Sequence, residues 1–179
     1  GNKDYIVLQD TDGKVRIIDR QGKDRIIVQG KLETLVNPIF AYRKTFASTN
    51  KNGSLVQIDV NGNVNKTGLE LKIGHKIDMT SKSLVTLSEN KLMIKGIPVI
   101  LPFGNYSSPK IFYIDNTIYV TITEYETKKV FAFYSNGNPV RGFPVYGTSV
   151  ADLTNADNDK AIEMIVQSDQ EELTIYQIN

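Results

Sequence analysis

Apolar residues recur mainly at every second position along this chain, in short runs that polar turns separate. The runs beginning at Val15 and Leu55 are rich in β-branched residues and are bounded by Gly, Asn and Asp. This alternation is typical of half-buried β-strands, and a helical period of 3.6 residues is almost absent. The pattern therefore predicts an all-β protein.

The runs repeat as a unit made of a strand, a polar turn and a second strand. The units begin at Tyr5, Phe46, Leu84, Ile118 and Glu163, and their second strands begin at Val15, Leu55, Leu92, Val130 and Leu173. Successive second strands start 40, 37, 38 and 43 residues apart. A period near 40 residues is expected for the four-stranded blades of a propeller. The repeat therefore predicts a β-propeller-like fold of about five blades.

Glycine and asparagine positions predict how the strands connect. Asp12-Gly13 and Asn52-Gly53 indicate two-residue hairpins, because such turns need residues with positive φ. The next reversal falls at Gly22, Gly62, Gly96 and Gly137, and a further short run precedes the later hairpins at 39–42, 76–79, 110–114 and 149–153. The total is about 18 strands, fewer than five complete four-stranded blades require. Either the first and last blades are incomplete, or residues upstream of Gly1 supply the missing strands.

The blade-like unit resembles PQQ-type repeats, in which a strand, an Asp-Gly turn, a second strand and a Gly turn follow one another. Residues 137–166, GNPVRGFPVYGTSVADLTNADNDKAIEMIV, are similar to the FG-GAP and VCBS-like repeat. Such repeats also close the C-terminal part of some large, uncharacterised bacterial envelope proteins. The resemblance implies that residues 1–179 are a single β-propeller-like domain, a C-terminal fragment of a longer extracytoplasmic chain, and Tyr5 starts a strand abruptly in accord with that view.

Oxygen-bearing side chains converge in sequence near the C-terminus. Asn155, Asp157 and Asp159 stand at alternate positions, and Glu163 follows. That spacing suits a hard cation such as calcium, which prefers oxygen ligands. Lys160 stands where the similar repeats have Gly, and the same residues also fit an ordinary polar turn whose Asx side chains bond their own backbone. We favour the turn and keep calcium as the alternative.

The remaining candidate chemistry points away from catalysis. No phosphate-binding, nucleophile-elbow or zinc-binding motif occurs, and Cys and Trp are absent. The single histidine, His75, has Lys72 and Lys76 as neighbours and is predicted to lie in a surface loop. Asp19 and Asp59 occupy equivalent repeat positions before a Gly, which favours turn capping over catalysis. Cofactor-binding PQQ-type repeats are rich in Trp, so we expect no quinone cofactor.

Charge and aromatic residues limit the partners that we expect. Residues 1–98 hold 16 Lys/Arg and 10 Asp/Glu, whereas residues 99–179 hold 5 and 10. The basic residues are scattered along strands, so no nucleic-acid surface is expected. Phe131, Phe133 and Phe143 are predicted to lie in the core, and Tyr125 is the candidate for an exposed ligand contact. There is no apolar run long enough to cross a membrane in this segment.

These observations predict a non-catalytic binding or scaffolding module of a bacterial envelope protein. Its expected partner is a protein or a neighbouring domain of the same chain. The alternative is a propeller that binds carbohydrate or a calcium-dependent ligand, and a weaker alternative is a hydrolase whose residues no motif marks.

Overall fold

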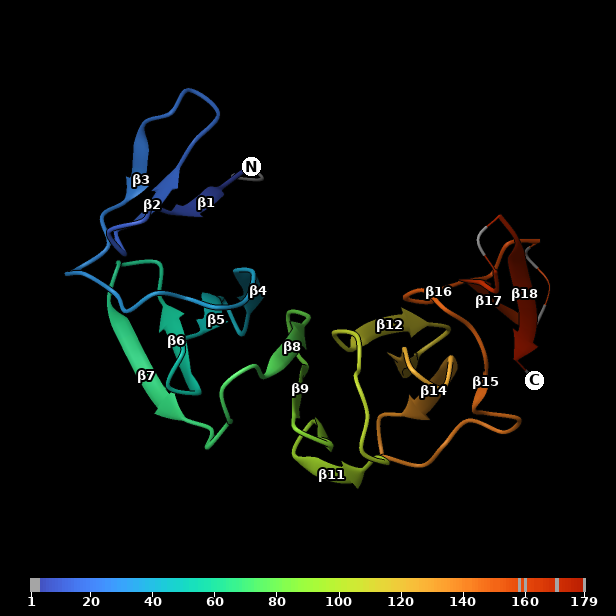
Figure 1. The fold of residues 1–179 in the computed structure, drawn as a ribbon. Coiled ribbons are helices and arrows are strands. Elements are labelled where there is room, and N and C mark those ends of the chain that lie inside the picture. Colours follow the sequence, from blue (N-terminus) through green and yellow to red (C-terminus); the bar gives the residue numbers. More distant parts are fainter. Residues whose placement is uncertain (1–3, 158, 160, 170, 179) are drawn as a thin grey trace. The chain divides into compact units, whose positions relative to one another are not determined.

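The computed structural model describes residues 4–157, 159, 161–169 and 171–178. These residues form 18 β-strands, which pair into five antiparallel sheets numbered here in chain order. Within each sheet the strands lie in chain order, so each sheet is a simple meander (Figure 1). No helix occurs among the residues described. The prediction of an all-β protein is confirmed.

Sheets 2, 3 and 4 have four strands each, and sheets 1 and 5 have three. Sheet 1 comprises β1 (Ile6–Gln9), β2 (Val15–Ile18) and β3 (Asp24–Ile26), and sheet 2 comprises β4 (Phe40–Tyr42), β5 (Thr45–Thr49), β6 (Ser54–Ile58) and β7 (Val64–Gly68). Sheet 3 holds β8 (Lys76–Met79), β9 (Leu84–Ser88), β10 (Lys91–Ile94) and β11 (Ile97–Ile100). Sheet 4 holds β12 (Lys110–Ile114), β13 (Thr117–Glu124), β14 (Lys129–Tyr134) and β15 (Val145–Tyr146), and sheet 5 holds β16 (Asp152–Thr154), β17 (Ile162–Gln167) and β18 (Leu173–Ile178). The expectation of incomplete first and last blades agrees with the two three-stranded sheets.

The chain divides into two compact units. Unit 1 comprises Gly1–His75 and Met79–Ser83, and it contains sheets 1 and 2. Unit 2 comprises Lys76–Asp78 and Leu84–Asn179, and it contains sheets 3, 4 and 5. The grouping of residues 1–179 into one domain stays a prediction.

The hairpin loops at Asp12-Gly13 and Asn52-Gly53 have three residues, so the prediction of two-residue hairpins at these two places is wrong. At the first hairpin the N–H of Asp10 donates to the carbonyl of Lys14, and the N–H of Gly13 donates to the carbonyl of Asp10. Asn50 and Ser54 pair in the same way around Gly53. Gly13 and Gly53 each have a positive φ, and a Cβ on Gly53 would lie 2.3 Å from the carbonyl oxygen of Leu71. The extra residue is what a turn with a single left-handed glycine at its end requires.

Turn capping at the repeated Asx positions is confirmed. The Oδ1 atom of Asp19 accepts hydrogen bonds from the N–H groups of residues 21 and 23, at 2.9 Å each. Asp59 does the same for residues 61 and 63. Hydrogen bonds from Asn63 lower the pKa of Asp59, in keeping with a carboxylate that serves the backbone as an acceptor.

Apolar side chains fill the space between successive sheets inside each unit. In unit 1, Val15 and Ile17 of sheet 1 pack with Val56 and Ile58 of sheet 2. In unit 2, one cluster joins sheets 3 and 4, and a second cluster joins sheets 4 and 5. β13 is consequently buried along Tyr119–Glu124, since sheet 4 packs on both faces. The part of the chain that the structure describes holds no helix with the length and apolar character needed to cross a membrane.

Candidate functional site

The loop between β16 and β17 brings together the residues with the predicted spacing for a cation. One carboxylate oxygen each of Asp157, Asp159 and Glu163 lie within 4.8 Å of one another. Asn155 reaches the same loop, where its side-chain amide donates to the carbonyl oxygen of Asp159 at 2.7 Å. We call these four residues the acidic loop. Lys160 lies outside the described residues, so its effect on the loop stays a prediction.

Backbone N–H groups supply the hydrogen bonds that the structure gives to the carboxylates of the acidic loop. Glu163 accepts from the N–H of Ala156 at 2.8 Å, and Asp157 accepts from the N–H of Asp159 at 3.1 Å. Asp159 accepts from the N–H of Ala161 at 2.5 Å. Among the described residues, no cationic side chain forms an ion pair with these three carboxylates.

One oxygen of the acidic loop has no hydrogen-bond partner among the described residues. The Oδ1 atom of Asn155 is buried, and no donor of the described part of the chain reaches it. A buried oxygen without a donor is costly, whereas a bound cation would satisfy it. The donor set of amide and carboxylate oxygens thus fits a hard cation such as calcium. The backbone hydrogen bonds equally fit an Asx-rich turn. The cation site and the polar turn therefore both remain open interpretations of this loop.

A different carboxylate, Glu124, is buried at the end of β13 with 3% of its surface exposed. Its Oε1 accepts from the N–H groups of Asn105 (3.0 Å) and Glu126 (3.1 Å), and its Oε2 accepts from the N–H (2.6 Å) and hydroxyl (2.5 Å) of Thr127. Burial alone would raise the pKa of Glu124, but these hydrogen bonds lower it to about 2. Burial, reinforced by the charge of Glu124, raises the pKa of Tyr106 to about 12.

Sequence reasoning missed Glu124, because its donor Asn105 is 19 residues away. The only local signal was the acidic turn sequence around Tyr125. Through four neutral donors, Glu124 ties Asn105 to the β13–β14 hairpin. Because it is almost fully buried and its own chain supplies four donors, Glu124 has the environment of a carboxylate that stabilises the fold.

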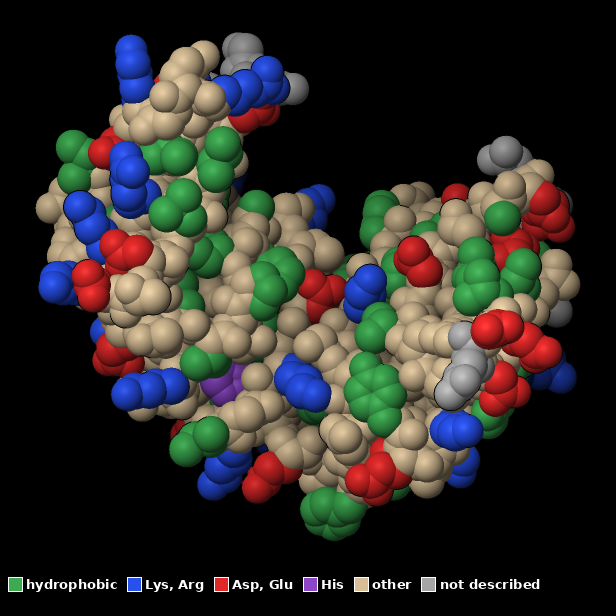
Figure 2. All heavy atoms as spheres, turned by 45° about the horizontal axis from the view of Figure 1, so that its top comes forward, with side chains coloured by type: hydrophobic (Ala, Val, Ile, Leu, Met, Phe, Trp, Pro, Cys, Tyr) green, Lys and Arg blue, Asp and Glu red, His purple; other side chains and the backbone are tan. Residues whose placement is uncertain are grey.

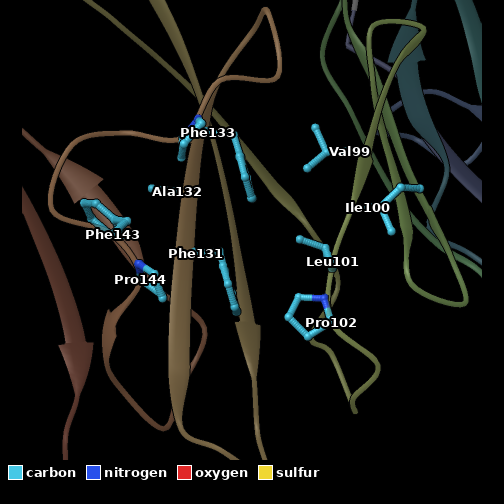
Figure 3. Close-up of a pocket in the computed structure, with 10 residues that line it drawn as sticks. Val99, Ile100, Leu101, Pro102, Phe131, Ala132, Phe133, Phe143 and Pro144 are labelled. Carbon is cyan, nitrogen blue, oxygen red and sulfur yellow. The ribbon is translucent and has the colours of Figure 1, made fainter.

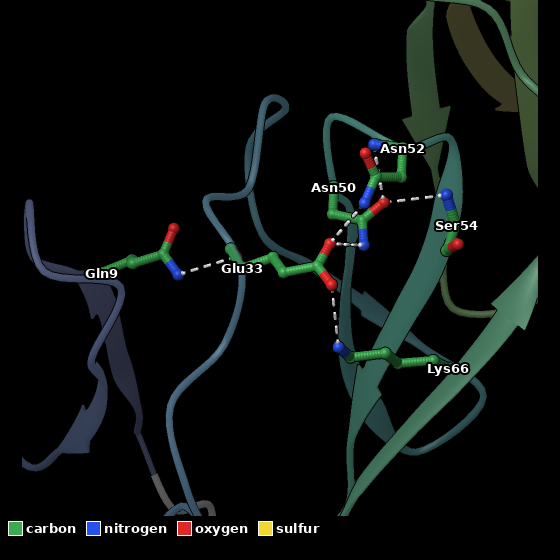
Figure 4. A network of polar contacts seen from close by, with 6 residues as sticks. All are labelled: Gln9, Glu33, Asn50, Asn52, Ser54 and Lys66. Carbon is green, nitrogen blue, oxygen red and sulfur yellow. Dashed lines mark hydrogen bonds and ion pairs between the residues drawn. The ribbon is translucent and has the colours of Figure 1, made fainter.

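Glu33 forms a polar network inside unit 1 that joins sheets 1 and 2 (Figure 4). Its carboxylate accepts from the side-chain amides of Asn50 (2.7 Å) and Asn52 (3.0 Å) and pairs with Lys66 at 3.4 Å. Its carbonyl oxygen accepts from the side-chain amide of Gln9, a sheet 1 residue, at 3.4 Å. These contacts hold the connection between the two sheets, and they leave the Glu33 carboxylate with three donors.

His75 is buried, with 5% of its surface exposed, so its prediction as a surface-loop residue is wrong. Its Nε2 lies 2.8 Å from the Thr49 hydroxyl, and its Nδ1 lies 2.9 Å from the carbonyl oxygen of Lys72. Thr49 is 26 residues earlier in the chain. The neighbouring lysines suggested a solvated loop, but the imidazole turns inward because both ring nitrogens find partners there.

The three phenylalanines that were predicted to lie in the core differ in how far they are buried. Phe133 is in the core, whereas Phe131 and Phe143 are only partly buried. Tyr125 is 39% exposed in the β13–β14 turn, and its N–H donates to the carbonyl of Asn105. The exposure of Tyr125 leaves its role as a ligand contact a prediction.

A pocket of about 300 Å³ lies between sheets 3 and 4 in unit 2, and the sequence did not reveal it. Val99 and Leu101 face Phe131 and Phe133 across it (Figure 3). The pocket is lined by Val99, Ile100, Leu101, Pro102, Phe131, Ala132, Phe133, Pro139, Phe143 and Pro144. Every lining side chain is apolar, so the pocket suits an apolar group. Its only sequence signal was the density of Pro and Phe in the segments 97–103 and 139–144.

Basic residues show no single patch on the face drawn in Figure 2, where Lys and Arg side chains are interspersed with Asp and Glu. In sheet 1 the arginines pair with neighbouring carboxylates: Arg16 with Asp24, Arg20 with Asp4 and Arg25 with Asp19. These pairs lie at the surface and are solvated, as the scattered pattern suggested.

No protein-family model and no curated protein matches this chain. Solved structures do resemble it. The computationally designed protein Ika8 is similar with a TM-score of 0.62 and 14% identity, over 99% of this chain and 57% of Ika8. The designed protein Ika4 is similar with a TM-score of 0.57 and 12% identity, over 88% of this chain and 99% of Ika4.

The third similar structure is BamB from Moraxella catarrhalis, with a TM-score of 0.58 and 16% identity. The match covers 96% of this chain and 60% of BamB, so the chain spans less than two thirds of BamB and of Ika8. BamB is a β-propeller, and together with the five antiparallel sheets this likeness confirms the propeller-like fold. At sequence identities this low, the likeness shows a shared fold and nothing about function.

Proposed function

We propose that this chain is a non-catalytic binding or scaffolding module that contacts a protein or a neighbouring domain of its own chain. The observation that carries the proposal is the apolar pocket between sheets 3 and 4 together with the apolar side chains beside it. Ile100 is 69% exposed, and Phe103, which directly follows pocket residue Pro102, is 89% exposed. Contiguous exposed apolar surface is a common mark of an interaction site.

The chemistry of the pocket supports binding over catalysis at this place. None of its ten lining residues has a titratable side chain, so the pocket offers no general acid, base or nucleophile. A volume of about 300 Å³ accommodates a large apolar side chain of a partner. Burial of such a side chain favours association by about 25 cal/mol per Å² of apolar surface removed from water. Phe103 and Ile100 would then flank the inserted group.

The test replaces Phe103 with a photoreactive phenylalanine in the full-length protein of the source organism. A discrete protein partner, or another segment of the same chain, is expected to be crosslinked. For a purified protein partner, Phe103→Asp is expected to raise Kd at least about tenfold, because one buried aromatic contact is worth more than 1.4 kcal/mol. Ile73→Asp is the matched control, since Ile73 is 95% exposed in unit 1. Equal weakening by both substitutions, or no crosslink at Phe103, would contradict the proposal.

A second candidate function is calcium-dependent ligand binding through the acidic loop. It is favoured by the convergence of the Asp157, Asp159 and Glu163 carboxylates and by the unpartnered Oδ1 of Asn155. A bound calcium ion would neutralise the three carboxylates and hold the loop for contact with a ligand such as a carbohydrate. Asn155, Asp157, Asp159 and Glu163 would supply the oxygens.

Thermal melts in calcium and in chelator test this second candidate. A ligand at 100 times its Kd adds about 2.7 kcal/mol to the free energy of unfolding, which raises the midpoint of a chain of this size by about 5–10 °C. Asp157→Ala is expected to abolish that rise, and Asp169→Ala, in the β17–β18 turn, is expected to leave it unchanged. Superimposable melts in calcium and chelator would exclude a working metal loop. A calcium-dependent signal on a glycan array would identify the ligand as carbohydrate.

The location that we propose is the bacterial cell envelope, outside the cytoplasm. Its support is the resemblance of residues 137–166 to repeats of large envelope proteins. Fractionation of the source organism with an antibody to this chain tests it. Recovery of the native protein in the cytosolic fraction would exclude the envelope.

A further inference from the structure

Sheet 5 is buried on one face only. Along β17 the residues Ile162, Met164 and Val166 are buried and the residues between them are half-buried, and on β18 the side chains of Leu173 and Ile175 are 74% and 63% exposed. In sheet 4, by contrast, β13 is buried at six successive positions because a sheet packs on each of its faces. Among the described residues of unit 2, sheet 5 therefore packs against one sheet, whereas sheet 4 packs against two.

The exposed face of sheet 5 has an apolar centre and acidic margins. The strand register sets Ile165 beside Ile175, with Asp152 on the other side of Ile165. Two residues along β17 from Ile165, Glu163 projects from the same face, and so does Leu173 on β18. We call Asp152, Glu163, Ile165, Leu173 and Ile175 the outer face of sheet 5. Residues 149–179 contain seven Asp or Glu and one Lys, so this region is strongly acidic.

Sheet 1 has an exposed face on its opposite side. The face that includes Val15 and Ile17 is buried against sheet 2. The other face pairs Ile6 with Ile18 and Leu8 with Arg16, and we call these four residues the outer face of sheet 1. Ile6 is 47% exposed and Leu8 is 39% exposed. This face too has an apolar centre, and its charged member Arg16 also pairs with Asp24.

The repeat relates the two outer faces as complements. Sheet 1 packs on sheet 2 through Val15, where the second strand of the sequence repeat begins, and sheet 4 packs on sheet 5 through Val130, the equivalent repeat position. The residue at this position in sheet 5 is Leu173, which is exposed. The receiving side of each contact is the other face of the next sheet, and sheet 1 exposes that receiving face. The outer face of sheet 5 is thus the kind of face that packs on a following sheet. The outer face of sheet 1 is the kind of face that receives a preceding sheet.

We propose that two copies of this chain associate head to tail, with the outer face of sheet 5 of one copy on the outer face of sheet 1 of the next. The contact would bury Leu173 and Ile175 against Ile6 and Leu8. It would also bring Arg16 near the carboxylates of Asp152 and Glu163 on the outer face of sheet 5, where opposite charges set the register. Two different surfaces meet, so the contact is heterologous and a chain with both faces intact can bind a copy at each end. This inference goes beyond the proposed function, and it needs no other partner.

Sedimentation velocity over a range of concentrations tests the proposal. The wild-type chain is expected to exceed its monomer mass of 20.0 kDa as concentration rises. Ile6→Glu alone and Ile175→Glu alone are each expected to stay monomeric, because each loses one of the two faces. An equimolar mixture of these two variants is expected to form a dimer and nothing larger, since it contains one intact pair of faces.

Controls separate loss of the contact from loss of folding. Val60→Glu introduces the same charge at a 63% exposed turn residue and is expected to associate like wild type. If a glutamate variant melts well below wild type, Leu8→Thr and Leu173→Thr replace the pair, because Thr retains β-propensity. A wild-type chain that is monomeric at every concentration overturns the proposal. So does a variant mixture that stays monomeric, or association that survives both substitutions.

Discussion

Glu124 and the acidic loop both place carboxylates at a turn between antiparallel strands of unit 2, but the chain surrounds them differently. Glu124 is alone and buried, and its two oxygens accept hydrogen bonds from four donors of Asn105, Glu126 and Thr127. Asp157, Asp159 and Glu163 stand together near the surface with one backbone donor each, beside an amide oxygen that has none. The first arrangement is complete without a ligand. The second has capacity left for a cation.

The contrast shows that the effect of an acidic residue on stability depends on whether its own chain supplies its hydrogen-bond donors. A carboxylate satisfied by its own chain stabilises the fold, and removing its charge should cost stability. A group of carboxylates that repel one another should gain stability when a charge is removed, unless a cation is bound. The two regions are therefore expected to respond to the same chemical change with opposite sign.

The largest effect is expected from Glu124→Gln. The new amide group would turn N–H donors toward the N–H and hydroxyl donors that Glu124 now accepts, so buried donors lose their acceptor. The expected cost is about 3 kcal/mol in the free energy of unfolding. Urea denaturation at pH 7 measures it, with Glu126→Gln as the exposed control of the same chemistry. A cost below about 1 kcal/mol would remove Glu124 from its structural role.

Acid should remove the same contribution. The pKa of Glu124 is about 2 in the folded protein, below its ordinary value of 4.5. The ionised carboxylate therefore stabilises the fold fully above pH 4.5, and this stabilisation declines as pH falls from 4.5 toward 2. The difference in free energy of unfolding between wild type and Glu124→Gln is expected to be constant from pH 5 to 7 and to shrink at pH 3. A difference that is unchanged at pH 3 would show that the charge of Glu124 is not what stabilises the turn.

Gly104→Ala is expected to displace Glu124 by steric contact. A Cβ at Gly104 would lie 2.7 Å from Cγ and 2.8 Å from Oε1 of Glu124. Because hydrogen bonds hold Glu124 in place, we expect a cost of about 2 kcal/mol in urea denaturation. Gly68→Ala is the control, since a Cβ there meets no atom within 4 Å. Equal effects of the two substitutions would contradict a rigid Glu124.

The smallest effect is expected in the acidic loop without calcium. Asp157→Asn keeps an Oδ1 acceptor for the N–H of Asp159 and removes one of three neighbouring negative charges. In chelator the melting midpoint is therefore expected to rise by about a degree or two, because surface charge pairs have small energies. Asp169→Asn, which stands outside the loop, is expected to have no such effect. A fall in the midpoint for Asp157→Asn would mean that the loop resembles Glu124 and that its charges are structural.

The fold was largely predictable because its signals are local. Alternation at Val15 and Leu55, and glycines at the turns, are read within a few residues, and the strands lie where those signals are. The hairpin loops at Gly13 and Gly53 were each predicted one residue too short, because Asp-Gly and Asn-Gly permit two turn geometries. The choice between them depends on how the hairpin packs, as at Gly53, which lies against the backbone of Leu71.

The site was less predictable, because its parts meet across long separations. The spacing of Asp157, Asp159 and Glu163 indicated convergence, since the three lie within one stretch of seven residues. The partners of Glu124 and His75 could not be read, as Asn105 and Thr49 lie 19 and 26 residues away. The pocket between Leu101 and Phe131 arises from two sheets, and no local pattern records which sheets are neighbours.

By itself, the sequence determined the all-β character, the blade repeat, the shortage of strands for five complete blades and the composition of the acidic loop. These follow from side-chain alternation and turn chemistry, which act between near neighbours. The tertiary structure alone decided that His75 and Glu124 are buried and that an apolar pocket opens beside Phe103. It also decided that Leu173 and Ile175 are exposed. Burial is a property of what packs against a residue, so it is set only when distant segments come together.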